Sequence, residues 1–293
     1  MPNLTFEGLP TYTWPGGAIQ GVVVLGLDRP ARGDALSVQL VGTEVSQMTV
    51  SAGKSREVIR DSRPFLSTSV DLRQSLQFVD AVHIAPGQYR APFSFPIPPN
   101  APPSLHTGPE PGGGWSSGRM DGMYVEYDLE ARLDVPWWVD AVAQSRIPVF
   151  STRRVLGTIA PVQTNPAPDH PGFQLSSATP TPLLPGQTWT LAYTVENPTH
   201  KSLKTLEVNV RRVVEYTVRG RSARAVGESY GAAVTLGGKD PSYTGTLPIT
   251  VPNSEEATGP GTGELYRTYW LLSASLGIEW SFSVELQTPL TPA

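Results

Sequence analysis

The sequence predicts an all-β protein that folds as two tandem β-sandwich domains. Glycine and proline supply 28 and 30 of the 293 residues and are spread along the chain. Proline interrupts helices, so this composition favours many short strands and turns. Alternating apolar and polar residues recur throughout, and segments of the first half recur in the second. These three observations carry the prediction.

Residues 123 to 135 give the clearest strand signal. Side chains alternate between the two faces of a strand, so apolar residues of one parity and charged residues of the other predict a half-buried strand. The apolar set is Met123, Val125, Tyr127, Leu129, Ala131, Leu133 and Val135. Similar alternation occurs at residues 36–40 and 206–210, and no stretch of helical length shows apolar residues at i, i+3, i+4 and i+7.

The second half repeats the first in strand-sized blocks. Leu36, Val38 and Leu40 fall on Leu206, Val208 and Val210 at an offset of 170. The offset shrinks to 154 where Phe93, Phe95 and Ile97 match Leu247, Ile249 and Val251, and to 143 where Tyr127 and Leu129 match Trp270 and Leu272. The segments that join the matched blocks differ in length between the two halves, as expected for insertions in loops. We therefore predict a duplicated β-domain.

The predicted boundaries are residues 1–157 for the N-terminal sandwich, 158–172 for a linker and 173–293 for the C-terminal sandwich. Residues 157–172 contain four prolines and little periodicity, which is typical of a stiffened linker. Each half is expected to hold seven to nine strands. The last strand of the first half is predicted at about 144–156, and the first of the second half at about 173–177.

Composition excludes several classes of function. A net charge of -4 and a pI near 5.6 give no basic footprint for nucleic acid or for an anionic membrane. The absence of cysteine excludes disulfides, zinc–thiolate sites and thiol nucleophiles. The longest apolar run, residues 22–27, is too short to span a bilayer, and the first residues do not resemble a secretory signal. We expect a cytoplasmic protein without membrane insertion.

Several stretches resemble the arrestin family in the family's order. Residues 15–45 resemble its opening strands, in which a Pro-Gly turn precedes one strand and a second ends in Gly-x-Glu, here Gly42 and Glu44. Residues 84–104 resemble its Pro-Phe-x-Phe-x-Ile-Pro segment, and residues 123–138 the Tyr-rich strand that follows. Residues 183–210 resemble the start of the arrestin C-terminal domain, with Asn197 at the strand end.

This resemblance implies two immunoglobulin-like sandwiches acting as a non-enzymatic adaptor or scaffold for a protein partner. The abundance of Arg, Ala, Gly and Pro hints at a GC-rich bacterial genome, and bacterial members of the family are associated with sporulation control. The regulatory tail of receptor arrestins, the Pro-Pro-x-Tyr motif and the second-domain aspartate loop are not found in the sequence. A bacterial-type member in a regulatory or trafficking-like role fits these departures.

The sequence predicts neither an enzyme nor a metal or cofactor site. Gly114–Gly118 matches the nucleophile-elbow pattern around Ser116, but the strand before it and the helix after it are missing. Gly259, Gly261 and Gly263 precede a predicted strand, whereas a phosphate-binding loop precedes a helix. The histidines lack ligand spacing; they are His83, His106, His170 and His200. The acidic residues of 126–134 are expected on a solvated sheet face.

Two candidate sites remain. Arginine forks recognise phosphate or carboxylate, so an anion or phosphopeptide site is one hypothesis, with a solvated face or an ion pair as the alternative. Its residues are Arg153, Arg154, Arg211 and Arg212, of which Arg212 has inward parity. The second candidate is a partner-binding sheet edge at Leu4, Thr5, Phe6 and Tyr12, where an extended peptide could add as a strand. This strand is expected to run from residue 4 to residue 12, flanked by prolines 2, 10 and 15.

Two other functions stay open at this point. A small-ligand or carbohydrate-binding module would use the long Gly- and Pro-rich loop of residues 98–122, around Trp115, together with Trp137 and Trp138. Trp189 and Trp270 have apolar parity and are expected in the core. Self-association through sheet edges is also open.

Overall fold

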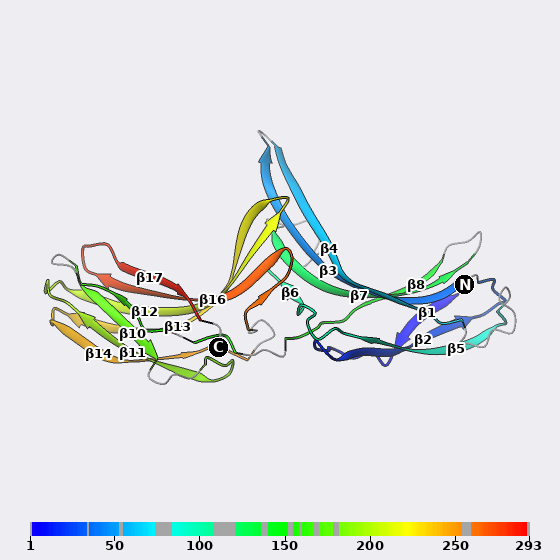
Figure 1. Cartoon of the computed structure of the whole chain (residues 1–293), viewed down its shortest axis with the longest axis horizontal. Helices are drawn as coiled ribbons and strands as arrows, with labels where there is room; N and C mark the ends of the chain where they lie inside the picture. Colours follow the sequence, from blue (N-terminus) through cyan, green and yellow to red (C-terminus); the bar gives the residue numbers. More distant parts are fainter. Residues whose placement is uncertain are drawn as a thin grey trace. The chain divides into compact units, whose positions relative to one another are not determined.

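The computed structural model describes residues 2–33, 35–52, 55–73, 84–107, 121–135, 140–151, 155–158, 160–166, 170–177, 182–253 and 259–291. Over these ranges the chain forms strands and no helix, so this part contains no helix that could cross a membrane. Figure 1 shows the strands in two groups, which follow one another along the sequence. Unit 1 is formed by Met1–Thr152, Val218–Arg221 and Gly263–Leu265, and unit 2 by the other residues.

Unit 1 contains a three-stranded and a five-stranded sheet. Its strands are β1 (Asn3–Glu7), β2 (Ala18–Leu27), β3 (Ala35–Ala52), β4 (Ser55–Asp71), β5 (Gly87–Pro96), β6 (Leu105–His106), β7 (Gly122–Asp134) and β8 (Ala141–Arg146). The smaller sheet has the order β1-β2-β5, and the larger has the order β4-β3-β7, with β6 and β8 both paired to β7. All of these pairs are antiparallel.

Unit 2 contains a four-stranded and a five-stranded sheet. Its strands are β9 (Val162–Thr164), β10 (Gly172–Ser177), β11 (Thr188–Glu196), β12 (Leu203–Val218), β13 (Arg221–Gly238), β14 (Ser242–Thr250), β15 (Gly261–Thr262), β16 (Tyr266–Ile278) and β17 (Val284–Pro289). The orders are β14-β11-β10-β9 and β13-β12-β16, with β15 and β17 paired to β16. The eight and nine strands of the described residues fall within the predicted range.

The two units share one strand order, as the internal repeat predicts. The path β5-β2-β1 corresponds to β14-β11-β10, and β4-β3-β7-β8 corresponds to β13-β12-β16-β17. The short strands β6 and β15 occupy equivalent places beside β7 and β16. β9 alone has no counterpart among the described strands of unit 1. It lies within the predicted linker segment.

Each unit has its own apolar core, built from the parity that the sequence shows. In β7, Val125, Tyr127 and Leu129 are fully buried, as predicted. In unit 2, Trp189 and Trp270 are 4% and 2% exposed and pack in one cluster, so both are core residues as expected. A period of two is fixed by strand geometry, which is why parity identifies the core so well.

Two strand predictions need correction. β1 ends at Glu7 and does not continue to Tyr12, because Gly8 adopts φ +68° and turns the chain. The strand expected at about 144–156 is also wrong, since β8 ends at Arg146 and Val149 makes only an isolated parallel bridge with Thr13.

Candidate partner-binding edge

β1 is the terminal strand of the smaller sheet of unit 1. It pairs only with β2 in the described part of the chain, with Leu4 opposite Leu25 and Phe6 opposite Val23. Leu4 is 7% exposed and anchors the strand in the core. The ring of Phe6 packs edge-on against Phe93, with 5.9 Å between ring centroids.

The backbone of β1 alternates between groups that face β2 and groups that face away from it. The carbonyl oxygens of Asn3 and Glu7 lie next to Gly26 and Gly21 of β2. Residues two apart in a strand direct their N–H and C=O groups to the same side, so those of Thr5 also face β2. The N–H and C=O groups of Leu4 and Phe6 therefore face the outer side of β1. These groups are the ones that an added strand would bind.

Beyond the turn at Gly8 the backbone is already occupied. Thr13 N–H donates to the Pro148 carbonyl at 2.9 Å, and Phe150 N–H donates to the Thr13 carbonyl at 2.8 Å. Tyr12 and Trp14 are 51% and 50% exposed. The open part of the edge is therefore Asn3–Glu7, and Tyr12 contributes an exposed ring rather than strand backbone.

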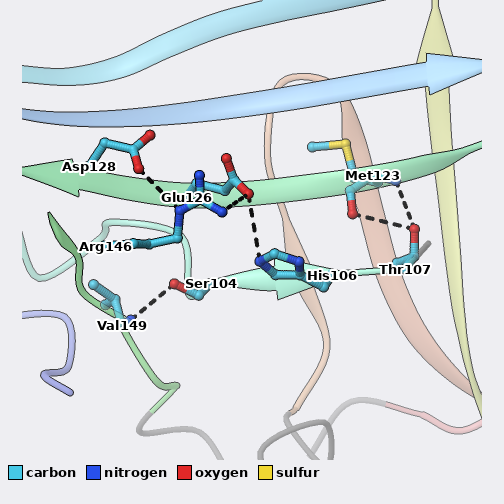
Figure 2. Close-up of polar contacts among 8 residues, drawn as sticks. All are labelled: Ser104, His106, Thr107, Met123, Glu126, Asp128, Arg146 and Val149. Carbon is cyan, nitrogen blue, oxygen red and sulfur yellow. Dashed lines mark hydrogen bonds and ion pairs between the residues drawn. The ribbon is translucent and has the colours of Figure 1, made fainter. Parts of the chain in front are cut away.

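In the five-stranded sheet of unit 1, hydroxyl groups of residues 104–107 bond to the backbone of Val149 and Met123. Figure 2 shows the Ser104 hydroxyl accepting a hydrogen bond from the Val149 N–H, at 3.0 Å. The Thr107 hydroxyl accepts from the Met123 N–H at 2.7 Å and donates to the Met123 carbonyl at 3.3 Å. Hydroxyl side chains thus continue the strand pairing where the backbone ladder of β6 ends.

An ion cluster lies between β6, β7 and β8. Arg146 Nη1 is 2.7 Å from Glu126 Oε1, and His106 Nε2 is 3.8 Å from the same oxygen (Figure 2). Arg146 Nε also donates to Asp128 Oδ1 at 3.1 Å. Only 11% of the Glu126 side chain is exposed, so the prediction of a solvated face is wrong at Glu126. The alternation of side chains assigned Glu126 to the correct face of β7, but β6 and Arg146 cover that face at Glu126.

A comparison with protein families agrees with the architecture of unit 1. Residues 7–156, more than half of the chain, match the family described as "Arrestin (or S-antigen), N-terminal domain". The chain belongs to the arrestin family. No curated protein matches the chain significantly. The arrestin match begins at the last residue of β1 and covers the rest of the first sandwich.

In this arrestin-family chain, the structure describes two of the four predicted arginines, Arg211 and Arg212. Arg153 and Arg154 lie outside the described residues. Arg211 and Arg212 are neighbours in β12 and therefore point to opposite faces of the sheet. Arg212 is 8% exposed, as its inward parity predicts. Within the described chain, the Nε of Arg211 is buried without a hydrogen-bond partner.

Arg267 of β16, which lies opposite Glu215 of β12, already has a carboxylate partner. Arg267 Nε donates to Glu215 Oε2 at 2.6 Å, and the Tyr269 hydroxyl donates to Glu215 Oε1 at 2.7 Å. These bonds from Tyr269 and Arg267 lower the pKa of Glu215. The pKa of Tyr269 is raised, first by burial and then by its bond to Glu215. An added anion would have to compete with Glu215 for Arg267.

Several remaining candidates cannot be placed relative to the β1 edge. His83, Ser116, Trp115, Trp137 and Trp138 lie outside the described residues. Over the described ranges, no group of three or more His, Asp or Glu side chains is placed to hold a metal ion. His106 is the histidine found in an ion cluster, and sequence reasoning missed it because its partners come from β7 and β8.

Proposed function

We propose that the protein is a non-enzymatic adaptor that binds a protein partner by accepting an extended segment at the open edge of β1. Membership of the arrestin family supports a scaffolding role in general. The resemblance to bacterial, sporulation-associated members supports a regulatory or trafficking-like role in a bacterial cytoplasm. The proposal that Arg153, Arg154, Arg211 and Arg212 assist by binding an anionic or phosphorylated group is separate and does not carry this one.

The observation that carries the proposal is the contrast between β1 and β10. Both strands flank the equivalent strand of their unit, since Leu4 pairs with Leu25 of β2 and Phe173 pairs with Val195 of β11. Leu25 and Val195 match in the 170-residue repeat. β9 is paired to the outer side of β10, whereas no described strand is paired to the outer side of β1, although β8 of the other sheet lies near β1. Unit 2 therefore contains an internal example of strand addition at this edge.

The β9–β10 pair indicates how a partner would bind. β9 runs antiparallel to β10, with Thr164 opposite Phe173 and Val162 opposite Leu175. Phe173 N–H is directed to β9, where the Thr164 hydroxyl accepts it at 2.9 Å. Leu4 of β1 occupies the equivalent place. We expect an antiparallel partner segment whose side chains opposite Leu4 and Phe6 face inward and whose residue opposite Thr5 faces outward, with backbone bonds supplying affinity.

The test uses two variants of Phe6, whose N–H faces outward. Phe6→Pro removes that N–H, and Phe6→Val is the matched control because it loses the same aromatic contact but keeps the N–H. Each tagged protein is crosslinked in its native host and purified, and co-purifying proteins are identified and quantified by mass spectrometry. We expect a stoichiometric partner with the natural protein and with Phe6→Val, and loss of it with Phe6→Pro.

Thermal unfolding of both variants separates loss of binding from loss of fold. Equal retention of the partner by both variants would show that binding does not use the β1 backbone. Recovery of the tagged protein alone would instead favour the small-ligand or carbohydrate-binding alternative.

A further inference from the structure

The four-stranded sheet of unit 2 has a hollow on its outer face, where β9, β10 and β11 lie side by side. Its volume is about 140 Å³, and we call it the Gly172 hollow. Pockets for drug-sized ligands begin at roughly 300 Å³, so this hollow fits one small molecule. Its lining includes Gln163, Asn165, Gly172, Gln174, Thr194 and Glu196.

The strand register explains why these side chains surround one point. Gln163 lies opposite Gln174, which lies opposite Thr194, so one polar row crosses β9, β10 and β11. Gly172 lies opposite Glu196 in the next row. Residues paired across antiparallel strands, or two apart in one strand, direct their side chains to the same face. The position of Gly172, which has no side chain, therefore lies among polar neighbours.

The backbone beside Gly172 is too close to admit a side chain. A Cβ atom at this position would lie 2.5 Å from the Thr164 carbonyl oxygen and 2.5 Å from the Pro166 nitrogen. Glycine in a strand interior often marks such a close approach of another backbone segment. The residues that follow β9 therefore form one wall of the hollow, next to the glycine.

The polar side chains of the Gly172 hollow are not used by the fold. Elsewhere on the same face, the Thr188 and Thr250 hydroxyls hydrogen-bond to each other at 2.9 Å. Amide, hydroxyl and carboxylate groups that face one hollow without a protein partner are available to a ligand. The side chains that make no hydrogen bond or ion pair with the described part of the chain are those of Gln163, Asn165, Gln174, Thr194 and Glu196.

Unit 1 does not repeat this arrangement. The pair equivalent to Gly172 and Glu196 is Asn3 and Gly26, so the glycine and the polar residue are exchanged between the two strands. No described strand beside β1 takes the place of β9. The hollow is therefore a feature of unit 2 and not a general consequence of the shared strand order.

The chemistry of the lining favours a neutral ligand that is rich in hydroxyl groups. Carboxamides and hydroxyls offer both donors and acceptors, and a sugar hydroxyl also needs both. Among the outward-facing residues of the strands β9, β10, β11 and β14, as the structure describes them, Glu196 is the only charged one. A carboxylate accepts hydrogen bonds at two oxygens, which suits two neighbouring hydroxyls. The described lining contains no cation that would hold phosphate.

We propose that the Gly172 hollow binds a single neutral sugar ring. The carboxamides of Gln163, Asn165 and Gln174 would bond to hydroxyls around the ring, and the Glu196 carboxylate would accept a neighbouring pair. The aromatic residue of the lining, Phe173, is only 2% exposed, so its ring offers no stacking platform. Because a few hydrogen bonds alone would hold the sugar, we expect a Kd of roughly 1 mM.

NMR titration of the full chain, labelled with ¹⁵N, tests the proposal. Glucose, galactose and N-acetylglucosamine are added in separate titrations. We expect at least one of them to cause saturable shifts centred on the Gly172 N–H and on the side-chain amides of Gln163 and Gln174. Gln174→Ala should weaken this binding at least about fivefold, because it removes one hydrogen-bonding side chain. Thr246→Ala, on the same exposed face but outside the hollow, is the matched control and should bind unchanged.

Thermal unfolding separates loss of binding from loss of fold. Gln174 is exposed, so Gln174→Ala should unfold at the same temperature as the natural protein. Absence of saturable shifts with all three sugars, or equal affinity of Gln174→Ala and the natural protein, would overturn the proposal.

Two salts test ligands of the other charge classes. Methylammonium chloride and sodium phosphate are titrated under the same conditions, and neither should saturate the shifts around Gly172. Saturation by methylammonium that Glu196→Gln abolishes would identify a cation site and overturn the proposal, as would saturation by phosphate. The proposed adaptor function does not depend on these results, because the variants leave β1 intact.

Discussion

β1 and β10 occupy the same place in two copies of one fold and differ in what lies beside them. In β1, Leu4 is buried and Phe6 is half-buried; in β10, Phe173 and Leu175 are both buried. The outer side of β10 is paired with β9, and that of β1 is paired with no described strand. The comparison shows that an edge is created by the absence of a neighbour rather than by the sequence of the strand itself.

The longest edge strands are protected in a different way. β4 and β13 are 17 and 18 residues long, which would favour unwanted pairing. β4 carries Arg56, Arg60, Arg63 and Pro64, and β13 carries Arg221, Arg224 and Glu228. Charge and proline discourage edge-to-edge contact. The short β1 presents neutral Asn3 and Thr5, which makes it the more suitable edge for a partner.

The largest expected difference between the two edges is in stability. Leu175→Ala should destabilise its unit by about 4 kcal/mol, because Leu175 is fully buried between β9 and β11. Leu4→Ala should destabilise by only about 2 kcal/mol, because β1 can relax on its open side. Urea unfolding of each variant measures both values. Equal losses would mean that β1 is held as firmly as β10.

The second largest expected difference between the two edges is in their rates of amide hydrogen exchange. The N–H groups of Leu4 and Phe6 face outward, whereas the Phe173 N–H is bonded to Thr164. We expect roughly hundredfold slower exchange at Phe173 than at Leu4 or Phe6, since exchange rates follow local opening. Addition of a partner at β1 should slow Leu4 and Phe6 selectively. Equal protection in the free protein would argue that the edge of β1 is already covered.

A smaller effect is expected on removing the hydroxyl that fastens β9. Thr164→Val deletes the acceptor of the Phe173 N–H and should lower stability by about 1 kcal/mol, while increasing exchange at Phe173. Thr190→Val on β11 is the control, because this exposed threonine faces solvent and its change should have little effect. If both variants unfolded alike, the Thr164 bond would contribute nothing to holding the added strand.

The smallest effect on stability is expected from breaking the ion pair on the outer face of the sheet that contains β1. Arg90 Nη1 donates to Glu7 Oε1 at 3.3 Å, and both side chains are about half exposed. Glu7→Gln should therefore cost less than about 1 kcal/mol, and less still at high salt. A double-mutant cycle with Arg90→Gln measures the coupling. A coupling of several kcal/mol would show that this pair, and not Leu4, holds β1 in place.

Sequence reasoning succeeded where the signal was local. The alternation at 123–135 gave β7 and its buried face, and the repeat gave the common strand order of both units. It missed β9, because three residues between prolines show no period. It missed the burial of Glu126, because parity assigns a side to a residue but does not say what covers that side. It extended β1 to Tyr12, because the positive φ of Gly8 has no signature in the alternation.

The sequence alone determined which residues of each strand face the core and that the domain is duplicated, because side-chain alternation follows from the covalent geometry of an extended chain. Tertiary structure decided which strand lies beside which. That choice left β1 open, placed β9 over β10, covered Glu126 with His106 and Arg146, and gathered polar side chains around Gly172. These outcomes depend on contacts between residues far apart in the chain, which no local pattern specifies.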